Sequence, residues 1–419
     1  MKLAIVGAGW AGLAAAVRAT EAGHQVTVFE SARHAGGRAR SVVHDHAGRA
    51  LTLDNGQHIL IGAYTETLAL MRSVGVDPDQ ALLRLPLDLR LADGSGIALP
   101  DRAPPWDALA GILGARGWGW RDKATLLAAT TRWQLAGFRC APQASVAQLC
   151  TGLTARVQQQ FVEPLCLSAL NTCADEASAS VFLRVLRDSL LGGRGGSNLL
   201  VPRRPLGALF PAPAMAWLQA RGQPVQLGTR VAALQQDGRA WRVDGQAFDR
   251  VLLACPSWEA ARLVRTADRA TTSAARSWLA CADALRFEPI TTVYATSATR
   301  LPRPMTALAG GPAQFVFDRR HLGEDGLLAF VVSVSRGTRE ELQQQVIAQG
   351  RAQLARFGLG DLQPVVTIVE KRATFACTPG LQRPGLQVAP GLSACGEYVA
   401  GPYPGTIEGA VRSALQALA

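Results

Sequence analysis

Three glycines near the start of the chain, Gly7, Gly9 and Gly12, have the spacing of a turn that binds phosphate. Gly7 allows the tight turn, Gly9 lets the backbone approach a pyrophosphate, and Gly12 lets the following helix lie close to the preceding strand. The free N–H groups at the start of that helix would bind the phosphates. Glu30 would accept hydrogen bonds from the hydroxyls of an adenosine ribose. This pattern predicts a dinucleotide site, which also includes Trp10, Ala11 and Ser31.

The elements around these glycines have the order that such a site requires. Residues 2–6 form a short β-pattern, residues 13–22 are an alanine-rich helical stretch, and residues 25–30 are a second β-pattern that ends in the acid. A strand, a glycine turn, a helix and a second strand form a βαβ unit. The alternative is a glycine-rich turn in an unrelated α/β fold, which would need all of these spacings to agree by chance.

A second glycine pair, Gly36 and Gly37, follows the βαβ unit, with Arg38 and Arg40 directly after it. Two glycines allow a backbone bend without a Cβ clash, and an arginine reaches a phosphate or a polarised ring. The combination resembles the flavoprotein family of amine oxidases and phytoene-type desaturases. This resemblance implies FAD as the cofactor, with the glycine pair and Arg38 along its pyrophosphate and flavin. A nicotinamide-dependent dehydrogenase does not need this second element.

The C-terminal region carries a matching pattern at Gly396, Glu397 and residues 401–413. It resembles the closing motif of the same family, in which a strand ends in glycine and an acid and a helix then points at the flavin. The resemblance implies that Gly396 and Glu397 approach the pyrophosphate-ribityl region and that the helix start stabilises negative charge on the reduced ring. The family usually has aspartate where this chain has Glu397. The predicted contacts at the helix are Gly405, Thr406, Ile407 and Ala410.

A middle segment supplies a third part of the same resemblance. Arg230 and Val231 would lie beside the adenine, and Cys255 lies in the Ala-Cys-Pro sequence that ends the next strand. We therefore predict an α/β protein with a Rossmann-like FAD-binding domain and an inserted substrate domain of mixed sheet and helices, as in amine oxidases and phytoene desaturases. The predicted FAD-binding domain comprises residues 1–62, 195–261 and 376–419, and the predicted substrate-binding domain comprises residues 63–194 and 262–375.

The sequence Asp-Asn-Gly-Gln-His at residues 54–58, together with residues 371–375 and Thr378-Pro379, narrows the resemblance. These motifs resemble the squalene-associated desaturase branch and, within it, the hydroxysqualene dehydroxylases of bacterial hopanoid synthesis. The resemblance implies that hydride from reduced FAD replaces the hydroxyl of hydroxysqualene and gives squalene, a long-chain isoprenoid. It also places a loop beside the flavin that contains Asn55, Gly56, Gln57 and His58.

The implied reaction needs a proton donor. An allylic alcohol loses water when a positioned acid protonates its hydroxyl, and hydride then reaches the resulting delocalised cation. His58 and Glu408 are the predicted donors, with Tyr403 and Tyr64 behind them. Each of the first two has a structural alternative. His58 would hold the flavin loop by a hydrogen bond, and Glu408 would be tied to the backbone at a helix start.

Three other functions remain open. A carotenoid or phytoene desaturase shares the fold, the cofactor and the polyene substrate class but runs oxidatively. An amine oxidase needs an aromatic cage at the flavin, where residues 392–413 offer Tyr398 and Tyr403 but no tryptophan. A non-catalytic escort protein on this fold, like the chaperones of prenylated GTPases, would not need the intact glycine motifs and Glu30.

The composition limits the partners and the compartment. The formal net charge is +11, almost wholly from arginine, but the arginines are scattered without a zinc-finger or RNA-binding signature, so we expect no nucleic-acid partner. The eight cysteines form no C-x-x-C pair and have no histidine at metal spacing, which predicts reduced thiols, no metal site and a cytoplasmic protein. No histidine or cysteine is placed for covalent attachment, so the FAD is expected to be non-covalent.

One segment predicts peripheral membrane contact. Trp106, Trp118, Trp120 and Trp133 lie among basic residues. Tryptophan beside arginine on an apolar helix is typical of the membrane–water interface, here the inner face of the membrane. Core tryptophans beside solvated arginines are the alternative, because the pattern does not say which helix face is exposed.

Overall fold

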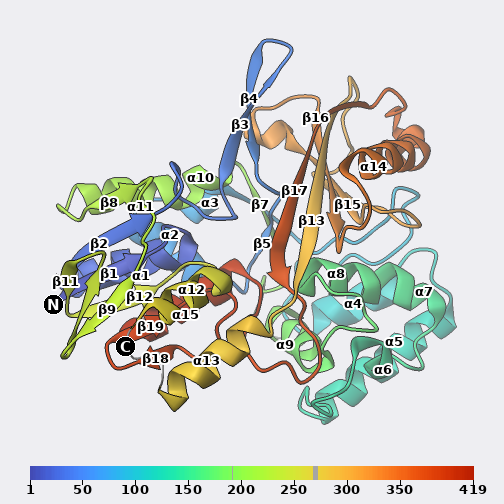
Figure 1. Ribbon diagram of the computed structural model, residues 1–419. Coiled ribbons are helices and arrows are strands. Elements are labelled where there is room, and N and C mark those ends of the chain that lie inside the picture. The colour runs from blue at the N-terminus through green and yellow to red at the C-terminus, as the bar shows by residue number, and fades with distance from the viewer. Residues whose placement is uncertain (191, 268–271) are drawn as a thin grey trace.

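The computed structural model describes residues 1–190, 192–267 and 272–419. The chain has two parts (Figure 1). The first is a mainly parallel sheet between helices and contains both marked termini, and the second is an antiparallel sheet beside a group of helices.

The first part is built on a six-stranded sheet in the order β18-β19-β12-β1-β2-β8. Strand β1 pairs in parallel with β2 and β12, and β12 pairs in parallel with β19. Helix α1 (Trp10–Glu21) joins β1 to β2, which confirms the predicted βαβ unit, although the helix begins three residues earlier than the alanine run suggests. The strands are β1 (Lys2–Val6), β2 (Gln25–Glu30), β8 (Val225–Leu227), β12 (Arg250–Leu253), β18 (Gln387–Ala389) and β19 (Leu392–Ala394).

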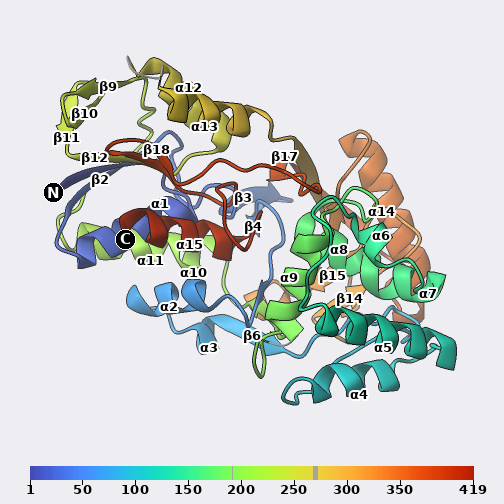
Figure 2. The same cartoon turned by 90° about the horizontal axis from the view of Figure 1, so that it is seen from below.

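Helices cover both faces of this sheet (Figure 2). On one face α1 contacts α15 (Ile407–Leu418) and α11 (Pro211–Gln219), and the alanines of α1 and α15 allow the close approach. Helices α12 (Ser257–Thr266) and α13 (Ser273–Asp283) lie on the other face. A small antiparallel sheet completes this part and consists of β9 (Leu234–Asp237), β10 (Ala240–Val243) and β11 (Gln246–Phe248). This is the predicted Rossmann-like architecture.

The second part contains the five-stranded sheet β14-β15-β16-β13-β17, whose neighbouring strands are all antiparallel. Side chains on β15 alternate between the two faces, so that Val316 packs with Val346 of α14, whereas Phe315 and Phe317 face a cavity. The elements are β13 (Phe287–Thr296), β14 (Met305–Ala307), β15 (Phe315–Asp318), β16 (Leu327–Ser333), β17 (Gln363–Phe375) and α14 (Arg339–Leu354).

The helices beside the antiparallel sheet are mostly short. They are α4 (Trp106–Gly114), α5 (Trp120–Leu135), α6 (Val146–Leu149), α7 (Ala155–Val157), η1 (Gln158–Val162), α8 (Glu163–Leu170) and α9 (Ala179–Leu190). Of the helices in the described ranges, none has the length and the apolar run that a bilayer-spanning segment needs.

The remaining elements connect the two parts or link elements within one part. Helix α2 packs against α15 and α13 packs against α12, so parts of both predicted substrate segments pack against helices of the Rossmann-like part. The predicted domain boundaries themselves stay a prediction. The connecting elements are β3 (Ser41–His46), β4 (Arg49–Asp54), β5 (Leu60–Ile61), α2 (Thr65–Ser73), α3 (Pro78–Ala81), β6 (Leu82–Leu85), β7 (Leu199–Pro202), α10 (Leu206–Leu209), η2 (Arg319–Leu322) and η3 (Ala355–Phe357).

Candidate functional site

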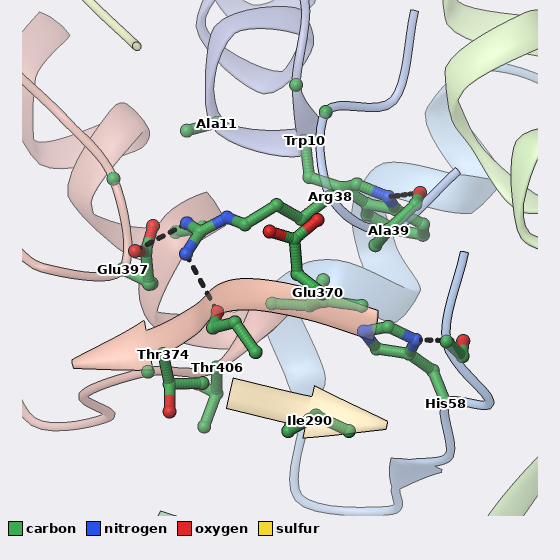
Figure 3. Close-up of a pocket in the computed structure, with 18 of the residues that line it drawn as sticks. Trp10, Ala11, Arg38, Ala39, His58, Ile290, Glu370, Thr374, Glu397 and Thr406 are labelled. Atoms are coloured by element: carbon green, nitrogen blue, oxygen red, sulfur yellow. Dashed lines mark hydrogen bonds and ion pairs between the residues drawn. The ribbon is translucent and has the colours of Figure 1, made fainter. Parts of the chain in front are cut away.

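A cavity of about 620 Å³, lined by residues from both parts of the fold, is the candidate functional site. The N-terminal glycine turn, the loop at residues 54–58 and the C-terminal motif all contribute to its wall. Every predicted cofactor-binding residue except Gly12 lines this cavity, and so do His58 and Tyr403, whereas Glu408 does not. Segments from both ends of the chain therefore meet at one site (Figure 3).

An added side chain would have a different effect at each of the three N-terminal glycines. At Gly7, where φ is +116°, an added Cβ would lie 2.6 Å from the Ala254 carbonyl oxygen. At Gly12 an added Cβ would lie 1.8 Å from the Gly7 carbonyl oxygen. At Gly9, φ is an ordinary −74°, and the nearest atom to an added Cβ would be Gly37 Cα at 3.8 Å. The fold therefore requires Gly7 and Gly12, whereas the missing side chain at Gly9 keeps the cavity open.

Glu30 is held beside the start of α1. Its carboxylate accepts hydrogen bonds from the Ala8 N–H at 2.7 Å and the Ala32 N–H at 2.8 Å. Helix α1 has neither a side-chain cap nor an acidic residue in its first turn. The N–H groups of the first turn of α1 are thus not bound by a capping side chain of the helix itself, which suits an anionic ligand.

The Arg38 side chain reaches from the N-terminal glycine pair to Glu397 of the C-terminal motif (Figure 3). Its guanidinium lies 2.5 Å from the Glu397 carboxylate and donates to the Ala373 carbonyl at 2.8 Å. Burial opposes the charge of Arg38, but Glu397 and Glu370 outweigh burial and raise its pKa. Glu370 on β17 also accepts from the Asn55 side chain at 3.1 Å. Sequence reasoning missed Glu370, since only strand pairing brings it to the loop at residues 54–58.

Arg230, Val231 and Cys255, which the resemblance places near the adenine, line the cavity, and two of them already have protein partners. Arg230 lies 2.5 Å from Glu259, and the Val231 carbonyl accepts from the Arg262 side chain at 2.7 Å. The Val231 N–H has no acceptor among the residues that the structure describes. Burial raises the pKa of the Cys255 thiol to about 12, so this thiol stays protonated at neutral pH.

His58 lines the cavity but is not set up as an acid. Its Nδ1 lies 2.6 Å from the Gly56 carbonyl oxygen, and because a carbonyl only accepts, Nδ1 carries the proton. Burial lowers the pKa of His58 below its ordinary value of 6.5, so the ring is neutral and Nε2 is an acceptor. The geometry favours the structural alternative, in which His58 holds the loop beside the cavity.

We predict that acidification from about pH 7.5 to about pH 5.5 destabilises the flavin-free protein and that His58→Gln reduces this loss. The unfolded histidine takes up a proton as the pH falls through 6.5, whereas folded His58 resists protonation, so the unfolded state gains stability. Glutamine keeps a donor for the Gly56 carbonyl. The measurement is the thermal midpoint at both pH values. His321, whose pKa burial also lowers, contributes equally in both proteins. An identical loss in the variant would contradict the prediction.

The prediction of Glu408 as a proton donor is wrong. The side chain is fully buried and accepts hydrogen bonds from the Thr67 N–H at 2.9 Å, the Thr67 hydroxyl at 2.7 Å and the Glu66 N–H at 3.1 Å. Arg412 adds an ion pair at 2.7 Å. The Glu408 carboxylate therefore binds backbone N–H groups at a helix start, as the structural alternative predicts. That helix is α2, whereas Glu408 itself belongs to α15.

Tyr403 and Tyr64 are two phenols that line the cavity near the start of α15. Burial and the neighbouring Asp188 carboxylate of α9 raise the pKa of Tyr403. Burial and Glu408 raise the pKa of Tyr64. Both phenols therefore keep their protons and act as hydrogen-bond donors at neutral pH.

A buried cluster around Arg319 holds the loop at residues 54–58. The guanidinium donates to the Gln57 side chain at 2.9 Å, and it lies 3.2 Å from Asp54 and 3.1 Å from Glu324. The Tyr294 hydroxyl donates to the Asp54 carbonyl at 2.8 Å. Arg319 is completely buried, although in the sequence it stands in a run of charged residues that indicates an exposed turn. Sequence reasoning missed this cluster.

The portion of the cavity lined mainly by the second part of the fold, here called the apolar arm, has many apolar side chains. Its wall combines side chains from the antiparallel sheet, the helices and the segment after β6, among them Leu87, Leu89, Leu165, Val181, Phe315 and Phe317. An apolar wall of this kind binds hydrocarbon and excludes water. The described residues contain no group of three or more His, Cys, Asp or Glu side chains that could hold a metal ion.

Two known proteins show how far the similarity extends. The hydroxysqualene dehydroxylase of Rhodopseudomonas palustris is 29% identical over 446 residues, which cover 98% of this chain and 95% of the relative. A probable zeta-carotene desaturase of Synechococcus elongatus is 44% identical, but the alignment covers 18% of this chain and 15% of the relative. The full-length similarity is thus to the dehydroxylase.

The fold and the family agree with the geometry of the cavity. A crystal structure of an oxidoreductase from Methanosarcina mazei superimposes with a TM-score of 0.74 over 100% of both chains at 16% identity, so the two share a fold. The family model described as flavin containing amine oxidoreductase matches residues 10–417. Because this match spans nearly the whole sequence, the chain belongs to the family of flavin containing amine oxidoreductases.

Proposed function

We propose that this flavoprotein is a hydroxysqualene dehydroxylase, in which hydroxysqualene and reduced FAD give squalene, water and oxidised FAD. The observation that supports this best is one cavity with a dinucleotide-binding wall at one end and an apolar arm at the other. The full-length similarity to a relative of this name supports the choice of substrate. A long isoprenoid fills an apolar arm, whereas a small amine would leave it wet.

Non-covalent FAD is the cofactor in this proposal. Gly9 and the uncapped start of α1 leave room and free N–H groups for the pyrophosphate, and Glu30 keeps lone pairs for ribose hydroxyls. The unpartnered N–H of Val231 suits an adenine nitrogen. The protonated thiol of Cys255 is a poor nucleophile, which supports binding without a covalent link.

Bound FAD, once reduced, supplies the hydride. Tyr403 donates its proton to the hydroxyl of the substrate, which leaves as water, and regains a proton from solvent through the partly exposed Asp188. His58 offers Nε2 as an acceptor that orients the substrate hydroxyl. The apolar arm holds the hydrocarbon and keeps water from the cationic carbon.

We predict that Tyr403→Phe folds and retains flavin but lowers kcat by about 10²–10⁴-fold, the usual contribution of a positioned acid. The aromatic ring keeps its contact with Arg412, whose guanidinium lies 5.0 Å from the ring centroid, so the loss concerns the hydroxyl alone. Tyr64→Phe removes another hydroxyl from the same cavity and serves as the matched control, with an expected loss below about tenfold. Equal turnover of wild type and Tyr403→Phe would remove Tyr403 from the mechanism.

The proposed function is tested by anaerobic incubation of the photoreduced protein with hydroxysqualene. Formation of squalene together with reoxidised flavin is the expected result. Conversion of phytoene under oxidising conditions, with hydroxysqualene unchanged, would establish a carotenoid desaturase instead. A colourless protein that binds no FAD would leave only the escort function.

Hydroxysqualene is a long hydrocarbon that partitions into lipid. The proposed enzyme therefore works at a membrane, which in this proposal is the inner, cytoplasmic face.

A further inference from the structure

The four tryptophans of the segment after residue 105 divide into two pairs. Trp118 and Trp133 are core residues, with 6% and 3% of their surface exposed, and the Trp118 indole donates to Gln160 at 2.7 Å. Trp106 on α4 and Trp120 on α5 are 62% and 78% exposed. Only Trp106 and Trp120 are therefore available to a partner.

Helix α5 turns an apolar stripe toward solvent. Trp120, Ala124, Ala128, Thr131 and Leu135 are all exposed and follow one another at intervals of three or four residues, so they share one face of the helix. Leu135 is 86% exposed. Such a stripe normally packs against a core. Here the core side of α5 is occupied by other residues, such as Leu126 and Trp133, and the stripe is left uncovered in the chain.

Helix α4 lies beside α5 (Figure 2) and carries further exposed apolar side chains. Trp106 is exposed at its start and Leu113, 54% exposed, near its end, with Leu109 and Ala110 partly exposed between them. Together with the stripe on α5 these residues form the α4–α5 surface. Large exposed apolar side chains that gather on two adjacent helices mark a binding surface rather than an ordinary solvated one.

The charges around the α4–α5 surface are almost all positive. Exposed arginines lie on the two helices or next to them in the sequence, namely Arg102, Arg116, Arg121, Arg132 and Arg139, and the exposed Asp101 pairs with Arg194. The two acids of these helices are largely withdrawn from solvent. Asp107 is buried, and the Asp122 carboxylate accepts from the Gly119 N–H at 2.8 Å and from the Thr154 hydroxyl at 2.6 Å. The complementary partner therefore has a negatively charged surface with an apolar interior beneath it.

The α4–α5 surface lies close to the apolar arm of the cavity. Leu87 and Leu89 line that arm, and the Leu87 carbonyl accepts from the Leu99 N–H at 2.8 Å. The Leu99 side chain packs on Gly111 of α4, where an added Cβ would lie 3.1 Å from Leu99 Cδ1. One short segment of chain thus forms a wall of the cavity and the support for α4.

We propose that the α4–α5 surface docks on a lipid bilayer that contains anionic lipid. Trp106 and Trp120 insert at the level of the headgroups, Leu113 and Leu135 reach the acyl boundary, and the surrounding arginines bind the headgroup phosphates. Hydrophobic insertion is thus combined with electrostatic attraction, and stable peripheral binding requires two such contributions. Delivery of the substrate from this bilayer to the apolar arm rests on the proposed function, whereas the docking itself does not.

The test is co-sedimentation of the flavin-loaded protein with vesicles of phosphatidylcholine alone or with phosphatidylglycerol. We expect binding to the anionic vesicles that weakens as salt is added. Trp106→Ala with Trp120→Ala should weaken it by at least about tenfold. Val43→Ala, at another exposed apolar side chain on β3, is the control and should bind as wild type. Unchanged binding by the double tryptophan variant would overturn the proposal.

The charge contribution is tested separately. Arg121→Glu with Arg132→Glu should abolish binding to the anionic vesicles, whereas the same change at exposed Arg239 and Arg276, outside the α4–α5 surface, should not. Equal losses in the two variants would show that vesicle binding depends only on net charge and would overturn the proposal.

A dimer in solution that the tryptophan substitutions dissociate, without vesicle binding, would assign the surface to a second copy of the chain. Vesicle binding in a protein that leaves hydroxysqualene unchanged would refute the proposed function and not the docking.

Discussion

Replacement of Arg319 by methionine should lower the free energy of unfolding by about 3–5 kcal/mol, because it leaves the carboxylates of Asp54 and Glu324 without their cation. Arg319 and Asp54 are both buried, so solvent cannot take over the role of the guanidinium. The measurement is denaturant unfolding of the flavin-free protein. The loop at residues 54–58 would lose its anchor at Gln57 at the same time, so flavin retention should fall as well.

The matched control for this prediction is Arg300→Met. Arg300 pairs with Asp325 at 3.2 Å, but both side chains are mostly exposed, so water and salt screen the pair. We expect a loss of less than about 1 kcal/mol there. A loss at Arg319 as small as that at Arg300 would mean that the buried cluster does not stabilise the fold.

Gly9→Val should give a folded protein that binds FAD at least about 100-fold more weakly, because the new side chain occupies the space of the pyrophosphate. The backbone at Gly9 has an ordinary φ of −74°, and the nearest protein atom to its Cβ would be 3.8 Å away. The chain itself therefore tolerates the substitution. Flavin content of the purified protein and FAD titration of the apoprotein measure the effect.

Gly12→Val is the informative comparison for Gly9→Val. A Cβ at Gly12 would lie 1.8 Å from the Gly7 carbonyl oxygen, so this variant should fail to fold rather than fold without flavin. Thermal unfolding of the two apoproteins separates these outcomes. Wild-type flavin content in Gly9→Val would show that Gly9 does not border the cofactor.

The parts of the fold that local pattern determines could be predicted from the sequence. The βαβ unit and the convergence of the two chain ends depend on glycine turns and on short apolar strands, and both are confirmed. The Arg319 cluster and Glu370 could not be predicted, because their partners come from distant strands. Glu408 was misassigned for the same reason: its partners Glu66 and Thr67 lie on a helix from the other end of the chain.

The exposure of each tryptophan could not be predicted from the sequence, for a different physical reason. Sequence periodicity identifies the faces of a helix but does not say which face the rest of the chain covers. On α5 both faces carry apolar residues, so only the packing separates Trp133 in the core from Trp120 in solvent. The core interpretation is therefore right for Trp118 and Trp133, whereas membrane contact stays a prediction for the exposed Trp106 and Trp120.

The pairing of β12 with β19 has a consequence for synthesis of the protein. Strand β12 lies between β1, which leaves the ribosome early, and β19, which emerges much later. Until β19 arrives, one edge of a central strand has no hydrogen-bonding neighbour, and α1 lacks the α15 surface that covers it. Nascent chains should therefore depend on chaperones, and be prone to aggregate, until β19 and α15 have been synthesised.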